Sequence, residues 1–310
     1  MKKYLEDLRK ELKNNGLNDF DIQDIIDDLC QMIQEAKNEG LNDEDIPNKF
    51  GKPEDLARDL AKDSKGDEEN TTKYSDILLT STSARKIEIR LINEDIIIKQ
   101  SKNNEFEIYG ENIIKSNYII KEDHNCISIE RKMGFLSKIK SFSQSGESFT
   151  IKVPKVQLDL VNINSKSSDA NIEDLDLVDL NLNTISGDYK IRNVHGDSFK
   201  VKNISGDIIL DEISFDSMSV SNVSGDFSIK KAHIKNQLNI NTVSGDYKVN
   251  DSDTKDLTYH SVSGDFIGQE FYPESVSLKS VSGDIKIINK DHDRKITIKS
   301  KKSLSGDISI

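Results

Sequence analysis

The sequence predicts an α+β protein in which a small N-terminal helical domain precedes an all-β, single-stranded β-solenoid (a β-helix or β-roll) with repeats of about 19 residues. Two observations lead to this prediction. Apolar residues recur at helical spacing over the first 62 residues, and the tripeptide Ser-Gly-Asp recurs seven times from residue 186 onward. A repeat this short predicts stacked units, because one unit of about 19 residues cannot bury its own apolar face.

Composition and charge restrict the class of protein. The chain has 310 residues, with 43 Lys and Arg against 55 Asp and Glu, so its net charge is -12. We therefore expect no nucleic-acid partner, because phosphate binding needs a clustered basic surface. No apolar run approaches the roughly 20 residues that span a bilayer, and the charged start MKKYLEDLRK differs from a signal peptide. These features predict a cytoplasmic protein, with a peripheral membrane position or surface exposure as alternatives.

Cys30 and Cys126 are expected to be small buried residues rather than partners in a disulfide bond.

The first 62 residues predict a helical domain. In KKYLEDLRKELKNNG the apolar residues lie on one helical face, and Gly16 follows where a helix can end. A second stripe runs through residues 22–36 and is followed by Gly40. Pro53 then stands at a first helical position in FGKPEDLARDLAKD, and Phe50 is expected to fill the small core.

The FGKPEDLARDL stretch and the order of these helices resemble the HAAS family, a small helical domain that bacteria often fuse to membrane segments or encode beside PadR-type regulators. The resemblance implies a signalling or docking domain that binds a protein partner without chemistry. A plain stabilising helical cap is the alternative. Residues 63–75 are polar and predict a linker, which gives a helical domain at 1–62 and a solenoid domain at 76–310 with repeats from about 167.

Alignment on the Ser of each tripeptide predicts which side chains point inward. The apolar residue three positions later and the aliphatic residue one position earlier are both expected inside, and the small polar residue two positions earlier is expected outside, next to the corner. The positions three later are Tyr189, Ile208, Phe227, Tyr247, Phe266, Ile285 and Ile308. The positions one earlier are Ile185, Ile204, Val223, Val243, Val262, Val281 and Leu304. The positions two earlier are Thr184, Asn203, Asn222, Thr242, Ser261, Ser280 and Ser303.

The tripeptide itself predicts a corner. Gly adopts a positive φ without steric cost, and Ser and Asp side chains hydrogen-bond nearby backbone amides. The corner glycines are Gly187, Gly206, Gly225, Gly245, Gly264, Gly283 and Gly306. The stacked acids are Asp188, Asp207, Asp226, Asp246, Asp265 and Asp284. A calcium-binding roll would use a denser Gly and Asp pattern, so we expect no metal and no cofactor, although a cation would relieve the repulsion along this column.

No catalytic constellation stands out in the sequence, which predicts a protein that is not an enzyme. His195 and His233 occupy equivalent positions in the repeat but lie two coils apart. This separation of about 10 Å is too large for both to bind one zinc ion, so both side chains are expected to be solvated. His124, His260 and His292 have no partner at ligand or triad spacing. A carbohydrate-active β-helix enzyme is the competing hypothesis, and it would need acidic and basic residues converging in a cleft.

The strand-like stretch KIEIRLINEDIIIKQS together with the VSGD repeats resembles the bacterial putative-adhesin family of β-solenoids, which includes proteins of the LiaG, LiaX and YvlB type linked to cell-envelope stress. The resemblance covers about residues 77–310. It implies a non-enzymatic interaction module, and hence a regulatory or scaffold protein in envelope-stress signalling whose partner is a membrane-associated stress regulator. A surface-exposed protein that binds envelope polymers or cationic peptides is the alternative.

Two further contacts are expected from local sequence. RKMGFLSKIKSF at residues 131–142 combines positive and apolar residues, so it predicts either a hairpin packed on the solenoid or weak contact with an anionic membrane. The residues expected to make that contact are Lys132, Phe135, Leu136, Lys138, Lys140 and Phe142. SGDISI at the C-terminal coil predicts either a monomer with a short, twisted last strand or a homodimer through Ile308 and Ile310.

Overall fold

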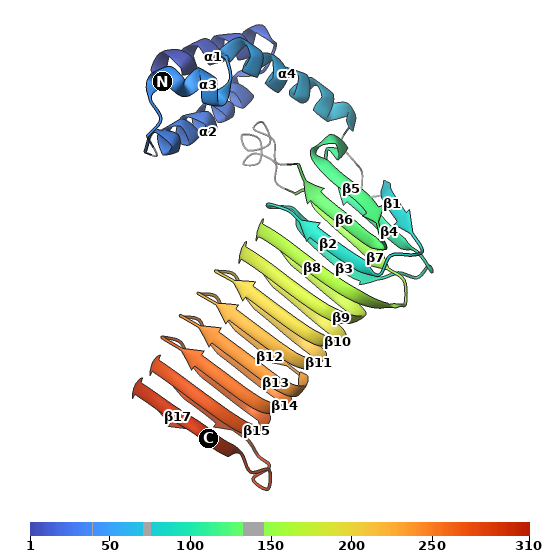
Figure 1. The fold of residues 1–310 in the computed structure, drawn as a ribbon, viewed down its shortest axis with the longest axis vertical. Coiled ribbons are helices and arrows are strands. Elements are labelled where there is room, and N and C mark those ends of the chain that lie inside the picture. Colours follow the sequence, from blue (N-terminus) through green and yellow to red (C-terminus); the bar gives the residue numbers. More distant parts are fainter. Residues whose placement is uncertain (39, 71–75, 133–145) are drawn as a thin grey trace. The chain divides into compact units, whose positions relative to one another are not determined.

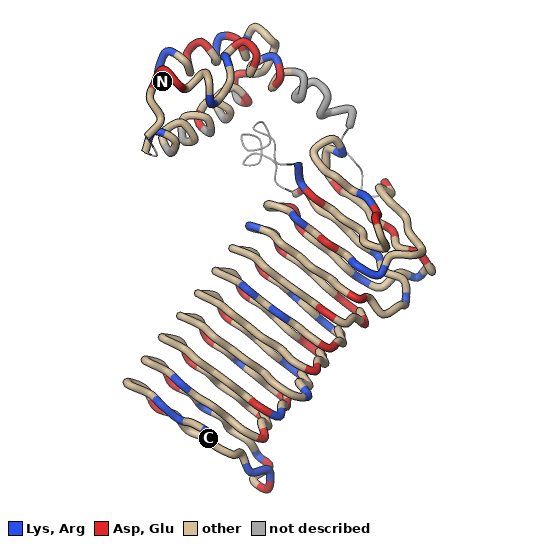
Figure 2. Tube along the Cα trace, in the orientation of Figure 1, with Lys and Arg blue, Asp and Glu red and all other residues tan. Residues whose placement is uncertain are grey.

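The computed structural model describes residues 1–38, 40–70, 76–132 and 146–310, and it shows two compact units, one built around the helices and one that holds most of the strands (Figure 1). Acidic and basic residues are interspersed along the helices and along the coils (Figure 2). None of the described helices is both long enough and apolar enough to cross a membrane.

The helical unit contains, in chain order, α1 (Lys2–Asn14), α2 (Asp19–Asn38), the 3-10 turn η1 (Asp43–Asp45), α3 (Ile46–Phe50) and α4 (Pro53–Asn70). The predicted small helical region at the N-terminal end is therefore confirmed. The apolar stripes form one core that includes Leu8, Leu12, Leu29, Ile33 and Leu60, and Phe50 is 4% exposed within it. The hydroxyl of Tyr4 donates a hydrogen bond to the carbonyl oxygen of Gly51, 2.8 Å away, which ties α1 to the end of α3.

Helix α4 continues beyond the predicted domain boundary. The structure places residues 63–70 in this helix, where the sequence predicted a linker, and residues 71–75 lie outside the described residues. A helix that has already started at Pro53 can continue through these polar residues, because a single internal glycine such as Gly66 costs only about 1 kcal/mol relative to alanine.

The strands lie mainly in the second unit. In chain order they are β1 (Ile77–Ser81), β2 (Lys86–Arg90), β3 (Asp95–Gln100), β4 (Phe106–Glu111), β5 (Tyr118–Asp123), β6 (Cys126–Arg131), β7 (Ser148–Val153), β8 (Gln157–Ser167), β9 (Ala170–Ser186), β10 (Tyr189–Asn203), β11 (Ile208–Asn222), β12 (Phe227–Lys230), β13 (His233–Thr242), β14 (Tyr247–Ser261), β15 (Phe266–Ser282), β16 (Ile285–Ile288), β17 (Thr297–Ser305) and β18 (Ile308–Ser309). A further 3-10 turn, η2 (Lys115–Asn117), precedes β5.

The strands from β8 onward form a parallel β-solenoid whose coils stack one after another along one axis (Figure 1). The register follows the sequence repeat, since Tyr189 pairs with Ile208, Ile208 with Phe227 and Phe227 with Tyr247. Each pairing joins residues 19 or 20 apart in the chain. The predicted solenoid and its repeat alignment are therefore confirmed.

The first coils do not stack in chain order. Strand β2 pairs in parallel with both β6 and β8, and β3 pairs in parallel with both β7 and β9. The β2–β3 coil thus lies between a coil formed by β6 and β7 and a coil formed by β8 and the start of β9. Strands β1 and β4 form an antiparallel pair beside this stack.

The interior of the solenoid is a continuous stack of apolar and aromatic side chains. The rings of Phe227 and Tyr247, at equivalent positions of successive coils, are parallel with centroids 4.9 Å apart. Tyr259 and Phe266 follow at a centroid distance of 4.9 Å. Aromatic pairs of this kind add roughly 0.5–1.5 kcal/mol each beyond the area they bury, so neighbouring coils support one another along the axis.

A second corner, made of non-glycine residues with positive φ, lies seven residues after Ser167 and after the Ser of the first five Ser-Gly-Asp tripeptides. Asp174, Asn193, Glu212, Lys231, Asp251 and Glu270 have φ between 49° and 58°. Side-chain contacts between coils support this strained backbone: the amide of Asn193 donates to Asp174 at 2.6 Å, and Lys231 forms an ion pair with Glu212 at 2.6 Å. Because the residue type varies from coil to coil, this corner was not predicted from the sequence.

Candidate functional site

The corner glycines combine positive φ with very close stacking. Gly187, Gly206, Gly225, Gly245, Gly264, Gly283 and Gly306 have φ between 106° and 128°. A Cβ atom added to Gly225 would lie 2.3 Å from the carbonyl oxygen of Gly206, in the coil before it. Any side chain at this position would therefore both strain the backbone and separate the coils.

The acidic residues of the same corner form a hydrogen-bonded ladder. The backbone N–H of Asp226 donates to the Oδ1 atom of Asp207 at 2.9 Å, and the N–H of Asp246 donates to Asp226 at 2.8 Å. The same contact repeats through Asp169, Asp188, Asp207, Asp226, Asp246, Asp265, Asp284 and Asp307. Each carboxylate except the last thus accepts a backbone hydrogen bond from the next coil. We call these eight residues the acidic ladder.

The end of the ladder shows the electrostatic consequence. The backbone N–H of Asp307 and the ammonium group of Lys286, 3.4 Å away, lower the pKa of Asp284 from its usual value. Backbone donors and cations therefore favour the charged form of the carboxylate. Among the described residues, no group of three or more His, Cys, Asp or Glu side chains is arranged to hold a metal ion.

The aliphatic residues immediately before the Ser are exposed, so the prediction that they point inward is wrong. Ile185, Ile204, Val223, Val243, Val262, Val281 and Leu304 are between 41% and 84% exposed. They form a column of apolar side chains at the corner, three residues from the acidic ladder in each coil. We call this column the aliphatic ladder.

The small polar residues two positions before the Ser are buried, so their predicted outward position is also wrong for all but Ser303. Asn222 is 5% exposed, and its amide donates to the carbonyl oxygen of Gly225 at 2.8 Å. Thr242 donates to the carbonyl oxygen of Ser244 at 3.0 Å. The carbonyl groups of the corner point away from the sheet, so a side-chain donor inside the coil must satisfy them. Because successive side chains of a strand point to opposite faces, the aliphatic residue next to this donor then lies on the outside of the coil.

The predicted contact segment at residues 132–142 is described only in part. The backbone N–H of Lys132 donates to the carbonyl oxygen of Asn117 at 2.8 Å, and its ammonium group lies 2.7 Å from the carbonyl oxygen of Ser116. Phe135, Leu136, Lys138, Lys140 and Phe142 lie outside the described residues.

The structure gives three histidines partners that the sequence did not indicate. The Nδ1 atom of His124 lies 2.6 Å from a carboxylate oxygen of its chain neighbour Asp123, and two other histidines have partners in neighbouring coils. The Nδ1 atom of His195 lies 3.4 Å from a carboxylate oxygen of Asp176, and that of His233 lies 2.5 Å from Asp253. Both partners in neighbouring coils stand at the equivalent position of the repeat, so a search for acidic residues one repeat length away in the sequence would have found them.

At the C-terminal coil, every residue of β17 is exposed, Ile308 is partly exposed and Ile310 is 41% exposed.

Comparison with known proteins agrees with this architecture. A putative lipid-binding protein of Parabacteroides distasonis has a similar structure, with 15% identity, a TM-score of 0.52, and coverage of 75% of this chain and 96% of its own. A putative adhesin of Bacteroides fragilis has 14% identity and a TM-score of 0.38, with coverage of 76% of this chain and 98% of its own. At these identities the first likeness supports the solenoid fold alone. No curated protein matches the sequence.

Family profiles match both parts of the chain. The HAAS profile matches residues 3–59, which confirms the resemblance seen in the FGKPEDLARDL stretch. The profile described as Toastrack DUF4097 matches residues 84–267 and 224–310, which together cover the solenoid. The chain therefore belongs to the Toastrack DUF4097 family and carries a HAAS region at its helical end.

Proposed function

We propose that this protein is a non-enzymatic interaction module that acts as a scaffold or regulator in cell-envelope stress signalling. In this proposal the HAAS region docks a protein partner, such as a membrane-associated stress regulator. The solenoid corner provides a second contact surface. The role in stress signalling is taken from the resemblance to proteins of the LiaG, LiaX and YvlB type.

The observation that carries this proposal is the aliphatic ladder. Six consecutive members, from Ile185 to Val281, are each at least 41% exposed although they belong to one of the most frequently buried residue classes. Contiguous exposed apolar surface on a folded protein commonly marks an interaction site. The coil repeat places these side chains about 4.8 Å apart, so the ladder is a long, narrow and regular apolar surface.

A chromosomal replacement tests this function. Val223→Thr, Val243→Thr and Val262→Thr keep the branched side-chain shape and replace one exposed methyl group by a hydroxyl in each of three central coils. Transcription of the envelope-stress response is then measured in the host after treatment with a cell-wall antibiotic. We expect a strongly reduced or constitutive response in this variant, and a normal response for the control Ser221→Ala, Asn241→Ala, which alters exposed positions on the strands that end just before Val223 and Val243. A normal response in the triple variant, at normal protein abundance, would refute the role of the ladder.

Binding of cationic amphipathic peptides is the second candidate function, and the neighbouring acidic ladder favours it. An apolar column beside a column of carboxylates is complementary to a peptide with one apolar and one cationic face. Fluorescence anisotropy with a labelled synthetic peptide of Leu and Lys measures this directly. Both Asp226→Asn, Asp246→Asn, Asp265→Asn and the triple Val variant should weaken binding, and binding that survives both changes would exclude this surface.

A further inference from the structure

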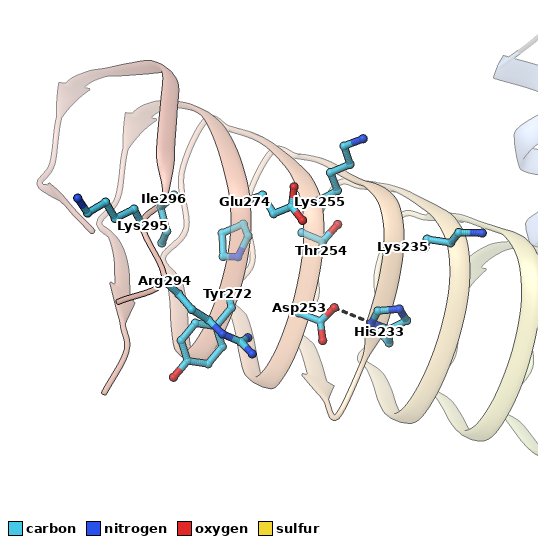
Figure 3. Close-up of a pocket in the computed structure, with 11 residues that line it drawn as sticks. His233, Lys235, Asp253, Thr254, Lys255, Tyr272, Glu274, Arg294, Lys295 and Ile296 are labelled. Carbon is cyan, nitrogen blue, oxygen red and sulfur yellow. Dashed lines mark hydrogen bonds and ion pairs between the residues drawn. The ribbon is translucent and has the colours of Figure 1, made fainter. Parts of the chain in front are cut away.

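A groove with a volume of about 490 Å³ lies on the side of the solenoid, across β13, β14, β15 and the loop before β17 (Figure 3). This volume lies within the range of roughly 300–1,000 Å³ that small-molecule sites occupy. Its walls carry the cations Lys235, Lys255, Arg294 and Lys295. The carboxylates in its wall are Asp253 and Glu274, so positive charge predominates locally in a chain whose net charge is -12.

The repeat builds one part of the groove and an irregularity of the repeat builds the rest. His233, Asp253 and Tyr272 form a column, since His233 pairs with Asp253 and Asp253 with Tyr272. The last repeat step is 23 residues long where the others are 19 or 20. The longer coil contains the loop at residues 289–296, which contributes Arg294 and Lys295 to the wall.

Several of the polar groups are held in place by neighbours. The guanidinium group of Arg294 lies 4.7 Å from the ring centroid of Tyr272, and its Nε atom is 3.5 Å from Asp291. The hydroxyl of Tyr272 donates to Glu270 at 2.6 Å. Figure 3 shows Arg294 beside the Tyr272 ring, and His233 directed toward Asp253. These contacts pre-organise one end of the groove.

Two lysines of the groove have no such anchor. Within the described part of the chain, neither Lys255 nor Lys295 forms an ion pair, whereas Lys235 lies 3.3 Å from Asp216. Lys255 is opposite Glu274 in the β14–β15 register, and Lys295 is two residues before Thr297, which pairs with Ser275 of β15. The two lysines thus belong to coils two steps apart, about 10 Å along the axis.

We propose that this groove binds a ligand with at least two anionic groups, phosphate or carboxylate, which Lys255 and Lys295 contact from two different coils. Arg294, fixed against Tyr272, supplies a planar donor for one of these groups. The overall negative charge of the chain repels anions at long range, so binding of such a ligand requires the local cations of this groove. This inference is independent of the function proposed for the aliphatic ladder, which lies at the Ser-Gly-Asp corner.

Isothermal titration calorimetry on the full chain in metal-free, low-salt buffer tests the proposal with three probes. Sodium tripolyphosphate presents phosphates, trigalacturonate presents carboxylates, and maltotriose is a neutral control of similar size. We expect one-to-one binding of tripolyphosphate, trigalacturonate or both, which also identifies the anionic group that the groove prefers. Binding of neither anion at low millimolar concentration, or equal binding of maltotriose, would overturn the proposal.

Matched variants locate the site. Lys255→Gln, Lys295→Gln should weaken binding of the anion at least about tenfold, because the loss of even one of the two charge-assisted hydrogen bonds has an effect of about that size. Lys248→Gln, Lys279→Gln removes the same charge from exposed positions on β14 and β15 that do not line the groove, and it should leave the affinity within about twofold. Equal weakening by the two pairs would show general surface attraction and refute the groove as the site.

Discussion

The backbone N–H of Asp226 donates a hydrogen bond to the carboxylate of Asp207 in the preceding coil, with 2.9 Å between nitrogen and Oδ1. Like charges one coil apart repel by about 0.9 kcal/mol at the dielectric constant of water. A hydrogen bond to a charged group contributes roughly 1.5–3 kcal/mol, and less where both groups are exposed. The backbone contact therefore offsets the repulsion between successive carboxylates of the column.

This contact predicts different effects for two substitutions of Asp226. Asp226→Asn keeps an oxygen that accepts the N–H of Asp246 and removes one repelling charge, so we expect a change in unfolding free energy below about 0.5 kcal/mol. Asp226→Ala leaves that N–H without its acceptor and should cost about 1 kcal/mol. Urea titrations of both variants measure the difference. Equal losses would show that the side-chain oxygen is not what stabilises the corner.

Gly225→Ala should destabilise the solenoid through two effects. The positive φ of 108° costs about 1–2 kcal/mol for a residue with a Cβ. The new Cβ would also lie 2.3 Å from the carbonyl oxygen of Gly206, and such overpacking adds about 1–3 kcal/mol. Gly51→Ala is the control, because Gly51 has φ of 90° and open space around its Cβ position. Circular dichroism during urea unfolding separates the strand and helix transitions, and a smaller loss at Gly225 than at Gly51 would contradict the steric argument.

The orientation of the valines predicts which of them tolerate a hydroxyl group. Val223→Thr, Val243→Thr and Val262→Thr affect exposed side chains, so the combined change should be below about 1 kcal/mol. Val201→Thr, Val220→Thr and Val249→Thr place hydroxyl groups among side chains that are at most 1% exposed, and each should cost about 1–3 kcal/mol. Comparable thermal midpoints for the two triple variants would show that the assignment of inside and outside is wrong.

The solenoid could be predicted from the sequence because its strongest signal, the spacing of Ser-Gly-Asp, is also its stacking register. The direction of the side chains at the corner could not be predicted in this way. The apolar character of Val223 suggested that it points inside, but the need of the corner carbonyl groups for a hydrogen-bond donor placed Asn222 there instead. The two-residue alternation of side chains along a strand already favoured an inward position for Asn222, because Val220 is buried and lies two residues before it. The stabilisation from a hydrogen bond to the carbonyl oxygen of Gly225 was thus larger than the stabilisation from burying the side chain of Val223.

The groove was missed for a different reason. Its cations come from β13, from β14 and from the loop at residues 289–296, and their proximity depends on the register between β13, β14, β15 and β17. The long last step of the repeat was visible, but its four extra residues could have formed any loop. The repeat length does predict the pairing of His233 with Asp253, which an alignment of the coils brings together.

Asp256 predicts a pH dependence of stability. Hydrogen bonds from Lys299, 2.5 Å away, and from Ser275 lower the pKa of the Asp256 carboxyl below its usual 3.8. Because the folded-state pKa is the lower one, this contribution is fully present above the unfolded-state pKa and is lost as the pH falls through the folded-state pKa. Between about pH 5 and pH 2 the wild type should therefore lose more stability than Asp256→Asn. Urea midpoints across that range measure it, and identical slopes for both proteins would exclude the contribution.

The ion pair between Arg131 and Glu147 supports the strongest prediction about a single side chain. Their side chains are 2% and 3% exposed, the Nη1 and Oε2 atoms are 2.9 Å apart, and Arg131 also donates to the hydroxyl of Tyr118 at 3.1 Å. Glu147→Gln would remove the carboxylate charge that contacts the buried guanidinium of Arg131, and breaking a buried ion pair in this way typically costs about 3–5 kcal/mol. Glu173→Gln is the matched control, since Glu173 lies 3.4 Å from Arg192 in a much more exposed pair, and it should cost less than about 1 kcal/mol.

The double change Arg131→Met, Glu147→Leu should recover part of the stability that Glu147→Gln loses, because it removes both charges and keeps most of the side-chain volume. If urea titration gave equal losses for Glu147→Gln and Glu173→Gln, or no recovery in the double variant, burial of the charge would not be the cause.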